Sequence, residues 1–191
     1  MYFKTRKFMI IFVAGVHGVG KTTLCEKFIN NFNNKSKDLL ISIKHESSSQ
    51  LIKKIKTDFT LENNKKTITS DYNQELLINE VNKIKNNYDY IILDGHFCLL
   101  DSNDNITPLK INVFKQLNLD YIILIEPKDI SQLKERYYNN KRLPITNLQK
   151  LVIEENKHAN YISDKLRIPL FIIPMDDYVT FDNIITQQII K

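Results

Sequence analysis

Residues 13–24 read VAGVHGVGKTTL, and this stretch decides the fold. The chain holds four glycines in 191 residues, and three of them, Gly15, Gly18 and Gly20, lie here. Positions 15–22 satisfy the pattern G-x-x-x-x-G-K-[ST], with an apolar run before them and an amphipathic stretch after them. The sequence therefore predicts a phosphate-binding loop between a strand and a helix.

The chemistry of phosphate binding explains why the glycines lie in this loop. Backbone N–H groups must turn inward around the phosphates, which requires positive φ angles and close approach without a Cβ. The following helix adds the partial positive charge of its N-terminus. We expect Lys21 to contact the β- and γ-phosphates of ATP and Thr22 to offer its hydroxyl to Mg²⁺. The predicted ATP-binding residues are Gly15, His17, Gly18, Val19, Gly20, Lys21, Thr22 and Thr23.

Length and composition predict one domain over residues 1–191, with 42% hydrophobic and 26% charged residues. The net charge of +5 is compatible with nucleic-acid binding or with a phosphate site, but the basic residues are scattered, so nucleic acid is not favoured. The two cysteines match no metal spacing. No run approaches the ~20 apolar residues of a membrane span, and we expect a cytoplasmic protein.

Apolar runs alternate with amphipathic stretches along the chain. Strands are predicted at 7–15, 38–43, 88–94, 119–126 and 168–174, and helices at 21–32, 48–56, 73–85, 110–117, 130–138, 146–166 and 181–190. Runs that are apolar on successive residues suit strands buried on both faces. The expected fold is therefore α/β, a parallel sheet with helices on both faces.

The fourth glycine follows a second chemical signal. YDYIILDGH (88–96) is a buried-strand pattern that ends in Asp94, the form of a Walker B carboxylate. In P-loop proteins that strand lies beside the P-loop strand, so Asp94 is expected near Mg²⁺. Gly95 is expected to let the chain turn away, and His96 is a candidate contact for a phosphate acceptor.

The chain resembles the P-loop nucleoside and nucleotide kinases, in particular the archaeal-type adenylate kinases and their uncharacterised AAA family ATPase relatives. The resemblance is carried by GVHGVGKTT (15–23), LDGH (93–96), the stretch 113–142, EENKHA (154–159) and IPLFII (168–173). It implies a five-stranded sheet in the order 2-3-1-4-5, an acceptor-binding region at about 44–85 and a short lid at about 137–146. It also implies that Arg136 and Arg142 act with Lys21 and Asp94 in catalysis.

Within the acceptor region, Ser48, Asn73 and Gln74 are the candidate acceptor contacts, together with His96. Serine and asparagine are also common N-cap residues, so a purely structural role is the alternative.

The sequence is compatible with three functions. The first is a Mg²⁺- and ATP-dependent kinase of a nucleoside monophosphate, whose ionised phosphate needs no general base. The second is a kinase of a hydroxyl acceptor, such as a nucleoside or a nucleic-acid 5′ end, with Asp94 as base. The third is a nucleotide-dependent switch with slow hydrolysis. The base-reading motif of a regulatory GTPase is missing, because the corresponding strand ends in IEPKDI. The oligomeric state is not visible in the sequence.

Overall fold

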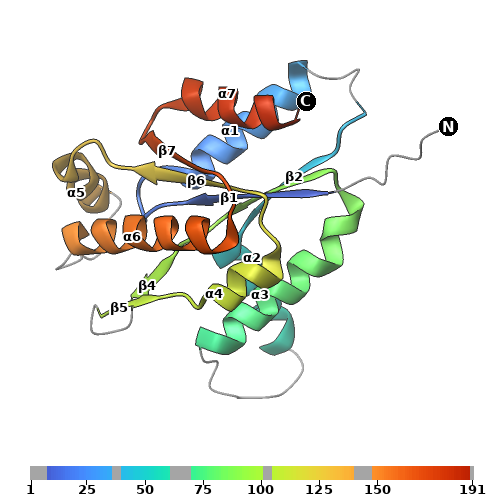
Figure 1. The fold of residues 1–191 in the computed structure, drawn as a ribbon, viewed down its shortest axis with the longest axis horizontal. Helices are drawn as coiled ribbons and strands as arrows, with labels where there is room; N and C mark the ends of the chain where they lie inside the picture. The colour runs from blue at the N-terminus through green and yellow to red at the C-terminus, as the bar shows by residue number, and fades with distance from the viewer. Residues whose placement is uncertain (1–7, 36–39, 61–69, 101–104, 140–147, 190–191) are drawn as a thin grey trace.

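The computed structural model describes residues 8–35, 40–60, 70–100, 105–139 and 148–189 (Figure 1). Its main sheet has five parallel strands in the order β2-β3-β1-β6-β7. These strands are β1 (Met9–Ala14), β2 (Ile43–Ser47), β3 (Tyr90–Asp94), β6 (Tyr121–Glu126) and β7 (Leu170–Pro174). Counted within this sheet, the order is 2-3-1-4-5, so the predicted fold class is confirmed.

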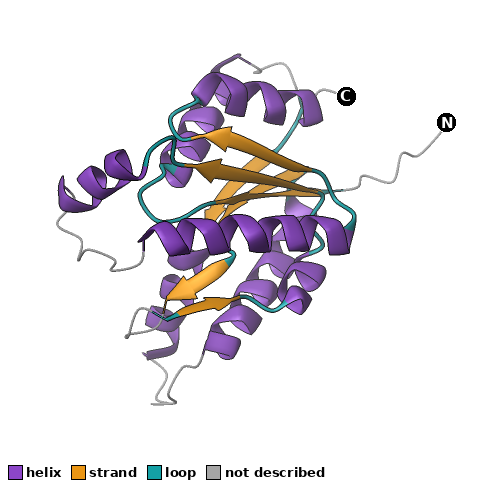
Figure 2. Cartoon of the chain, turned by 60° about the vertical axis from the view of Figure 1, so that its left-hand side comes forward, coloured by secondary structure: helices purple, strands orange, loops and turns teal. Residues whose placement is uncertain are grey.

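Helices cover both faces of the sheet (Figures 1 and 2). Helices α1 (Lys21–Lys35) and α7 (Tyr178–Ile189) lie on one face, and α3 (Ser70–Ile84), α4 (Ile111–Leu117) and α6 (Leu148–Leu166) lie on the other. Helix α2 (Ser48–Thr60) packs against α3 and β2, a 3₁₀ turn (Lys85–Asn87) follows α3, and α5 (Ile130–Asn139) follows β6. No helix in the described ranges combines the length and the apolar character that crossing a membrane requires.

The central strand β1 divides its side chains between two cores. Ile11 and Val13 pack with α1 and α7, whereas Ile10 and Phe12 pack with α3, α4 and α6. All four are at most 2% exposed, and burying a side chain of this size contributes about 1.5–3 kcal/mol. Burial on both faces is the reason that successive residues of this strand are apolar.

The predicted position of the second strand was wrong. The apolar run 38–43 was expected to form it, but β2 begins at Ile43 and continues through polar residues to Ser47. Residues 38–39 lie outside the described residues. Among the described strands, β2 lies at the edge of the sheet and pairs with β3, so a strand here need not be apolar on successive residues. The true register sets His45 beside Ile92 and Ser47 beside Asp94.

A two-stranded antiparallel sheet that the sequence did not predict follows Asp94. It pairs β4 (Cys98–Leu100) with β5 (Ile106–Pro108), and the backbone N–H of Leu109 donates to the carbonyl of Phe97 at 2.8 Å. The α6 helix packs against both strands. This hairpin fixes the segment that leaves the carboxyl end of the sheet, where ligands bind in open α/β folds.

Candidate active site

The loop between β1 and α1 has the backbone that its glycines predict. Gly15, Gly18 and Gly20 have φ angles of 139°, 83° and 92°, values that residues with a Cβ rarely adopt. A Cβ on Gly15 would also lie 2.5 Å from the carbonyl oxygen of Ile125. The N–H of Leu24 donates to the carbonyl of Gly20 at 2.9 Å, so α1 starts directly after the loop. Its N-terminus therefore faces the space that the loop encloses.

Lys21 lies across this loop. Its Nζ donates to the carbonyl oxygens of Gly15 at 2.6 Å and Val16 at 3.2 Å, and the residue is 7% exposed. These bonds fix the ammonium group over the loop whose amides bind phosphate in such motifs.

Thr22 and Asp94 meet at the carboxyl ends of β1 and β3, as their adjacent pairing requires. The Thr22 hydroxyl donates to Asp94 Oδ2 at 3.0 Å. Hydroxyl and carboxylate oxygens are ligands that Mg²⁺ prefers, so this pair fits the predicted magnesium site. Burial alone would raise the pKa of Asp94, but the hydrogen bond and charge of His45, the Lys21 ammonium and the Thr22 hydroxyl hold it below the ordinary carboxyl value.

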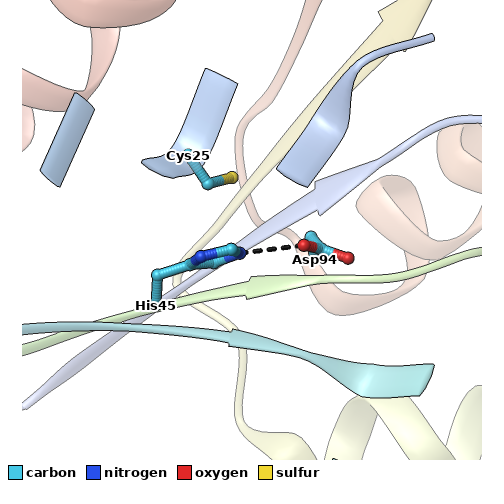
Figure 3. Close-up of side chains that lie close together, drawn as sticks. All are labelled: Cys25, His45 and Asp94. Atoms are coloured by element: carbon cyan, nitrogen blue, oxygen red, sulfur yellow. Dashed lines mark hydrogen bonds and ion pairs between the residues drawn. The ribbon is translucent and has the colours of Figure 1, made fainter. Parts of the chain in front are cut away.

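His45 is a neighbour of Asp94 that sequence reasoning missed. Its Nε2 lies 2.8 Å from the same oxygen, Oδ2, and β2 carries the ring to this position (Figure 3). Since Thr22 and His45 both bond to Oδ2, the other carboxylate oxygen takes part in neither contact. The pattern HESSS at 45–49 would have indicated this histidine only if the register of β2 had been known.

Cys25 lies close to His45 and Asp94, and all three side chains are of types that bind metal ions (Figure 3). One ligand atom of each lies within 4.8 Å of the others. Burial, with a smaller contribution from the Asp94 charge, raises the pKa of the Cys25 thiol well above its ordinary value. The hydrogen bond within this group joins His45 and Asp94.

Glu155 of α6 bonds to both the P-loop and the segment after Asp94, and no sequence pattern indicated this role. Its carboxylate accepts hydrogen bonds from the backbone N–H groups of Gly15, Phe97 and Cys98 at 3.3, 2.9 and 2.8 Å. The residue is 2% exposed, and burial raises its pKa although these donors act against the rise. One buried side chain thus fixes the start of the P-loop relative to the segment after Asp94.

A large polar cavity lies over the P-loop. Its volume is about 770 Å³, within the usual range for small-molecule sites. Two cationic side chains join Lys21 in its lining, Lys53 from α2 and Arg136 from α5. Arg136 Nη1 donates to the Gly18 carbonyl at 3.2 Å, and Nη2 donates to Asp176 at 2.5 Å. The cavity therefore has the size and charge to hold a polyphosphate.

A second, smaller pocket of about 160 Å³ adjoins the first, and Asp94, His96 and Ser49 line both. All four candidate acceptor residues line this second pocket, namely Ser48, Asn73, Gln74 and His96. The His96 ring also packs on His17 of the P-loop, with 4.2 Å between centroids. The remaining lining is mostly apolar.

Gly95 has a close-approach role besides the predicted turn, because a Cβ there would lie 2.8 Å from the Phe12 ring and 2.9 Å from Ser48 Oγ. Arg142 and most of the predicted lid at 137–146 lie outside the described residues, so the catalytic role expected for Arg142 stays a prediction.

Comparison with known proteins agrees with this geometry. A family model described as "AAA domain" matches residues 14–152, which include the P-loop, Asp94 and Arg136. No curated protein sequence matches the chain.

Solved structures share the fold at low identity. Shikimate kinase from Acinetobacter baumannii in complex with shikimate has a TM-score of 0.57 at 12% identity, with 97% of this chain and 94% of that chain covered. Shikimate kinase from Bacteroides thetaiotaomicron has a TM-score of 0.54 at 13% identity, covering 96% and 99%. An uncharacterized protein from Eubacterium ventriosum has a TM-score of 0.51 at 13% identity, covering 96% and 98%.

Proposed function

The chain belongs to the AAA domain family, and from this premise we propose that it is a Mg²⁺- and ATP-dependent phosphotransferase acting on a small acceptor. The observation that carries the proposal is the arrangement of two adjoining cavities around one carboxylate. Asp94 lines both the cationic cavity over the P-loop and the smaller pocket beside it. A donor phosphate and an acceptor would therefore meet at Asp94.

The residues of the larger cavity would bind the donor. The loop amides and the α1 N-terminus would hold the ATP phosphates, with Lys21 against the β- and γ-phosphates. Lys53 and Arg136 would stabilise the charge that spreads over the transferring phosphoryl group. Thr22 and Asp94 would hold Mg²⁺, which when bound neutralises phosphate charge.

Two kinds of acceptor suit this arrangement. A nucleoside monophosphate, the acceptor that the family resemblance favours, would bring an ionised oxygen and need no base. A hydroxyl would need its proton removed, and Asp94 lies where both cavities meet. The shikimate kinase from Acinetobacter baumannii binds shikimate, and the fold similarity supports a small-molecule acceptor here too.

The proposal is tested by ATP binding and acceptor-stimulated ADP formation. The Lys21→Ala variant should lower ADP formation by about 10²–10³-fold, the cost of removing one preorganised charge-stabilising group. The matched control is Lys27→Ala, an exposed lysine on the same helix, which should keep wild-type activity. Equal activity of the two variants, or no binding of ATP to the wild-type protein, would overturn the proposal.

A further inference from the structure

The smaller pocket has a chemistry that selects the acceptor. Its walls come from β1, α2, α3, the hairpin segment and α4, and Asp94 lies where it opens to the larger cavity. We propose that the acceptor is an uncharged molecule with a free hydroxyl and one aromatic ring that fills this pocket, and a pyrimidine nucleoside is an example. This inference rests on the phosphotransferase function proposed above and specifies its acceptor.

The size and walls of the pocket fit one ring. The aromatic side chains of Phe12 and Phe114 and the aliphatic side chains of Leu77, Leu99 and Val113 contribute to its lining. Its volume is about 160 Å³, close to the ~150 Å³ of an engineered apolar cavity that binds one benzene molecule. The body of the ligand is therefore ring-sized and mainly apolar on its faces.

The charges around the pocket argue against an anionic acceptor. Among the described residues that line it, there is no lysine or arginine, and the charged group is the Asp94 carboxylate. The described cations near the site, Lys21, Lys53 and Arg136, line the larger cavity instead. A phosphate or carboxylate placed here would lose its hydration, face a like charge and gain no lysine or arginine partner from the described lining, which costs several kcal/mol.

Two buried polar side-chain atoms in the pocket lining are free to form hydrogen bonds with a ligand. Ser48 Oγ and Asn73 Oδ1 are buried and have no hydrogen-bond partner within the described part of the chain. A buried polar atom without a partner costs about 1–3 kcal/mol, so a ligand that supplies N–H or O–H groups would recover this energy. Gln74 lines the pocket next to Asn73, and carboxamides pair well with the edges of nucleic-acid bases.

The hydroxyl of such an acceptor would lie toward Asp94. Its oxygen forms a bond to the γ-phosphorus of ATP while the bond from that phosphorus to the β,γ-bridging oxygen breaks. ADP leaves with the electron pair of the broken bond, and the hydroxyl proton is released to water. No oxidant, reductant or further co-reactant is needed.

The test compares neutral and phosphorylated probes in the wild-type protein. Transfer from γ-labelled Mg·ATP is measured with uridine, cytidine, their 5′-monophosphates and shikimate, alongside binding of each compound in the presence of a non-hydrolysable ATP analogue. At least one nucleoside should have a kcat/KM about tenfold or more above that of its monophosphate, since even one lost hydrogen bond or uncompensated charge has this effect.

Variants on α3 locate the effect. Asn73→Ala should lower kcat/KM for the preferred nucleoside by about tenfold, the value of one hydrogen bond, and leave ATP binding unchanged. Asn79→Ala, an exposed asparagine on the same helix, should match the wild type. Faster transfer to a monophosphate or to shikimate would overturn the inference and leave the phosphotransferase function standing. ATP binding with neither binding of nor transfer to a nucleoside would also overturn it. Failure to bind ATP would remove the proposed function itself.

Discussion

The two cavities that meet at Asp94 are built in opposite ways. The larger one lies over backbone amides and is lined by Lys21, Lys53 and Arg136. The smaller one is enclosed by aromatic and aliphatic side chains with a few uncharged polar groups. Charged walls suit a polyphosphate, which is the ligand that many P-loop proteins have in common. The shape and hydrogen-bonding groups of an apolar pocket instead distinguish one small molecule from another. Under the proposed function, the donor would be recognised by charge and backbone, and the acceptor by the fit of side chains.

Asp94 belongs to both cavities, so its loss should have the largest effect. Asp94→Asn keeps the size of the side chain but removes the charge, and we expect kcat to fall about 10³-fold, as for loss of a general base or metal ligand. ATP binding and transfer are measured separately, with His96→Asn as a variant at another residue that lines both cavities. If Asp94→Asn retained wild-type kcat, the two cavities would not meet at the reacting atoms.

The same variant should change how stability depends on pH. The folded-state pKa of Asp94 is lowered, so its ionised form stabilises the fold above the unfolded-state value of about 3.9. This contribution is lost as the pH falls through the folded-state pKa. Thermal unfolding of wild type and Asp94→Asn is measured from neutral to acidic pH. The wild type should lose stability in the acid range more steeply than the variant, and parallel curves would contradict the shift.

Arg136 tests the charged walls of the donor cavity. Arg136→Ala should lower kcat by about 10²-fold, less than a full arginine finger contributes, because Lys21 and Lys53 remain. Lys134→Ala, an exposed cation on the same helix, is the control and should leave kcat unchanged. If both variants behaved alike, Arg136 would act only through its bond to Asp176 and the Gly18 carbonyl.

Glu155 tests how the two regions are fixed to each other. In Glu155→Gln one carboxylate oxygen becomes an NH₂ group, so a backbone donor among Gly15, Phe97 and Cys98 loses its acceptor. The free energy of unfolding should fall by about 1–3 kcal/mol, measured by chemical denaturation. Glu154→Gln, its half-exposed neighbour, should change stability by less than about 1 kcal/mol, because its ion pair with Lys157 is exposed.

The smallest effect is expected at Ser48 in the acceptor pocket. Ser48→Ala removes a buried hydroxyl that has no hydrogen-bond partner among the described residues, so stability should stay equal or rise slightly. The KM for the acceptor should rise about tenfold or less, the value of one hydrogen bond, while the KM for ATP stays constant. A loss of stability with both KM values unchanged would make Ser48 a structural residue.

The P-loop part of the larger cavity was largely predictable from the sequence, because it depends on contiguous residues. One motif of eight positions fixes the loop backbone, Lys21 and Thr22, and the apolar strand before Asp94 places that carboxylate on the neighbouring strand. Continuous apolar runs also predict the strands that are buried on both faces, such as β1.

The rest of the site depends on residues that are distant in sequence and have no such pattern. His45 reaches Asp94 through the register of an edge strand, and the apolar-run rule misplaced that strand. In the sequence, Glu155 does not differ from other glutamates of an amphipathic helix. Its role depends on the packing of α6 against β4 and β5. Ser48 and Asn73 were candidates from the sequence, but serine and asparagine at helix starts are ambiguous with caps. Their position in one pocket required the packed structure.

The central claim, that this chain moves a phosphoryl group between its two cavities, is tested most directly by following the γ-phosphate of labelled Mg·ATP with and without a small acceptor. The account predicts that an acceptor accelerates ATP consumption and that the label is recovered on that acceptor rather than as inorganic phosphate. Slow release of inorganic phosphate at the same rate with every acceptor would contradict it and would indicate a nucleotide-dependent switch.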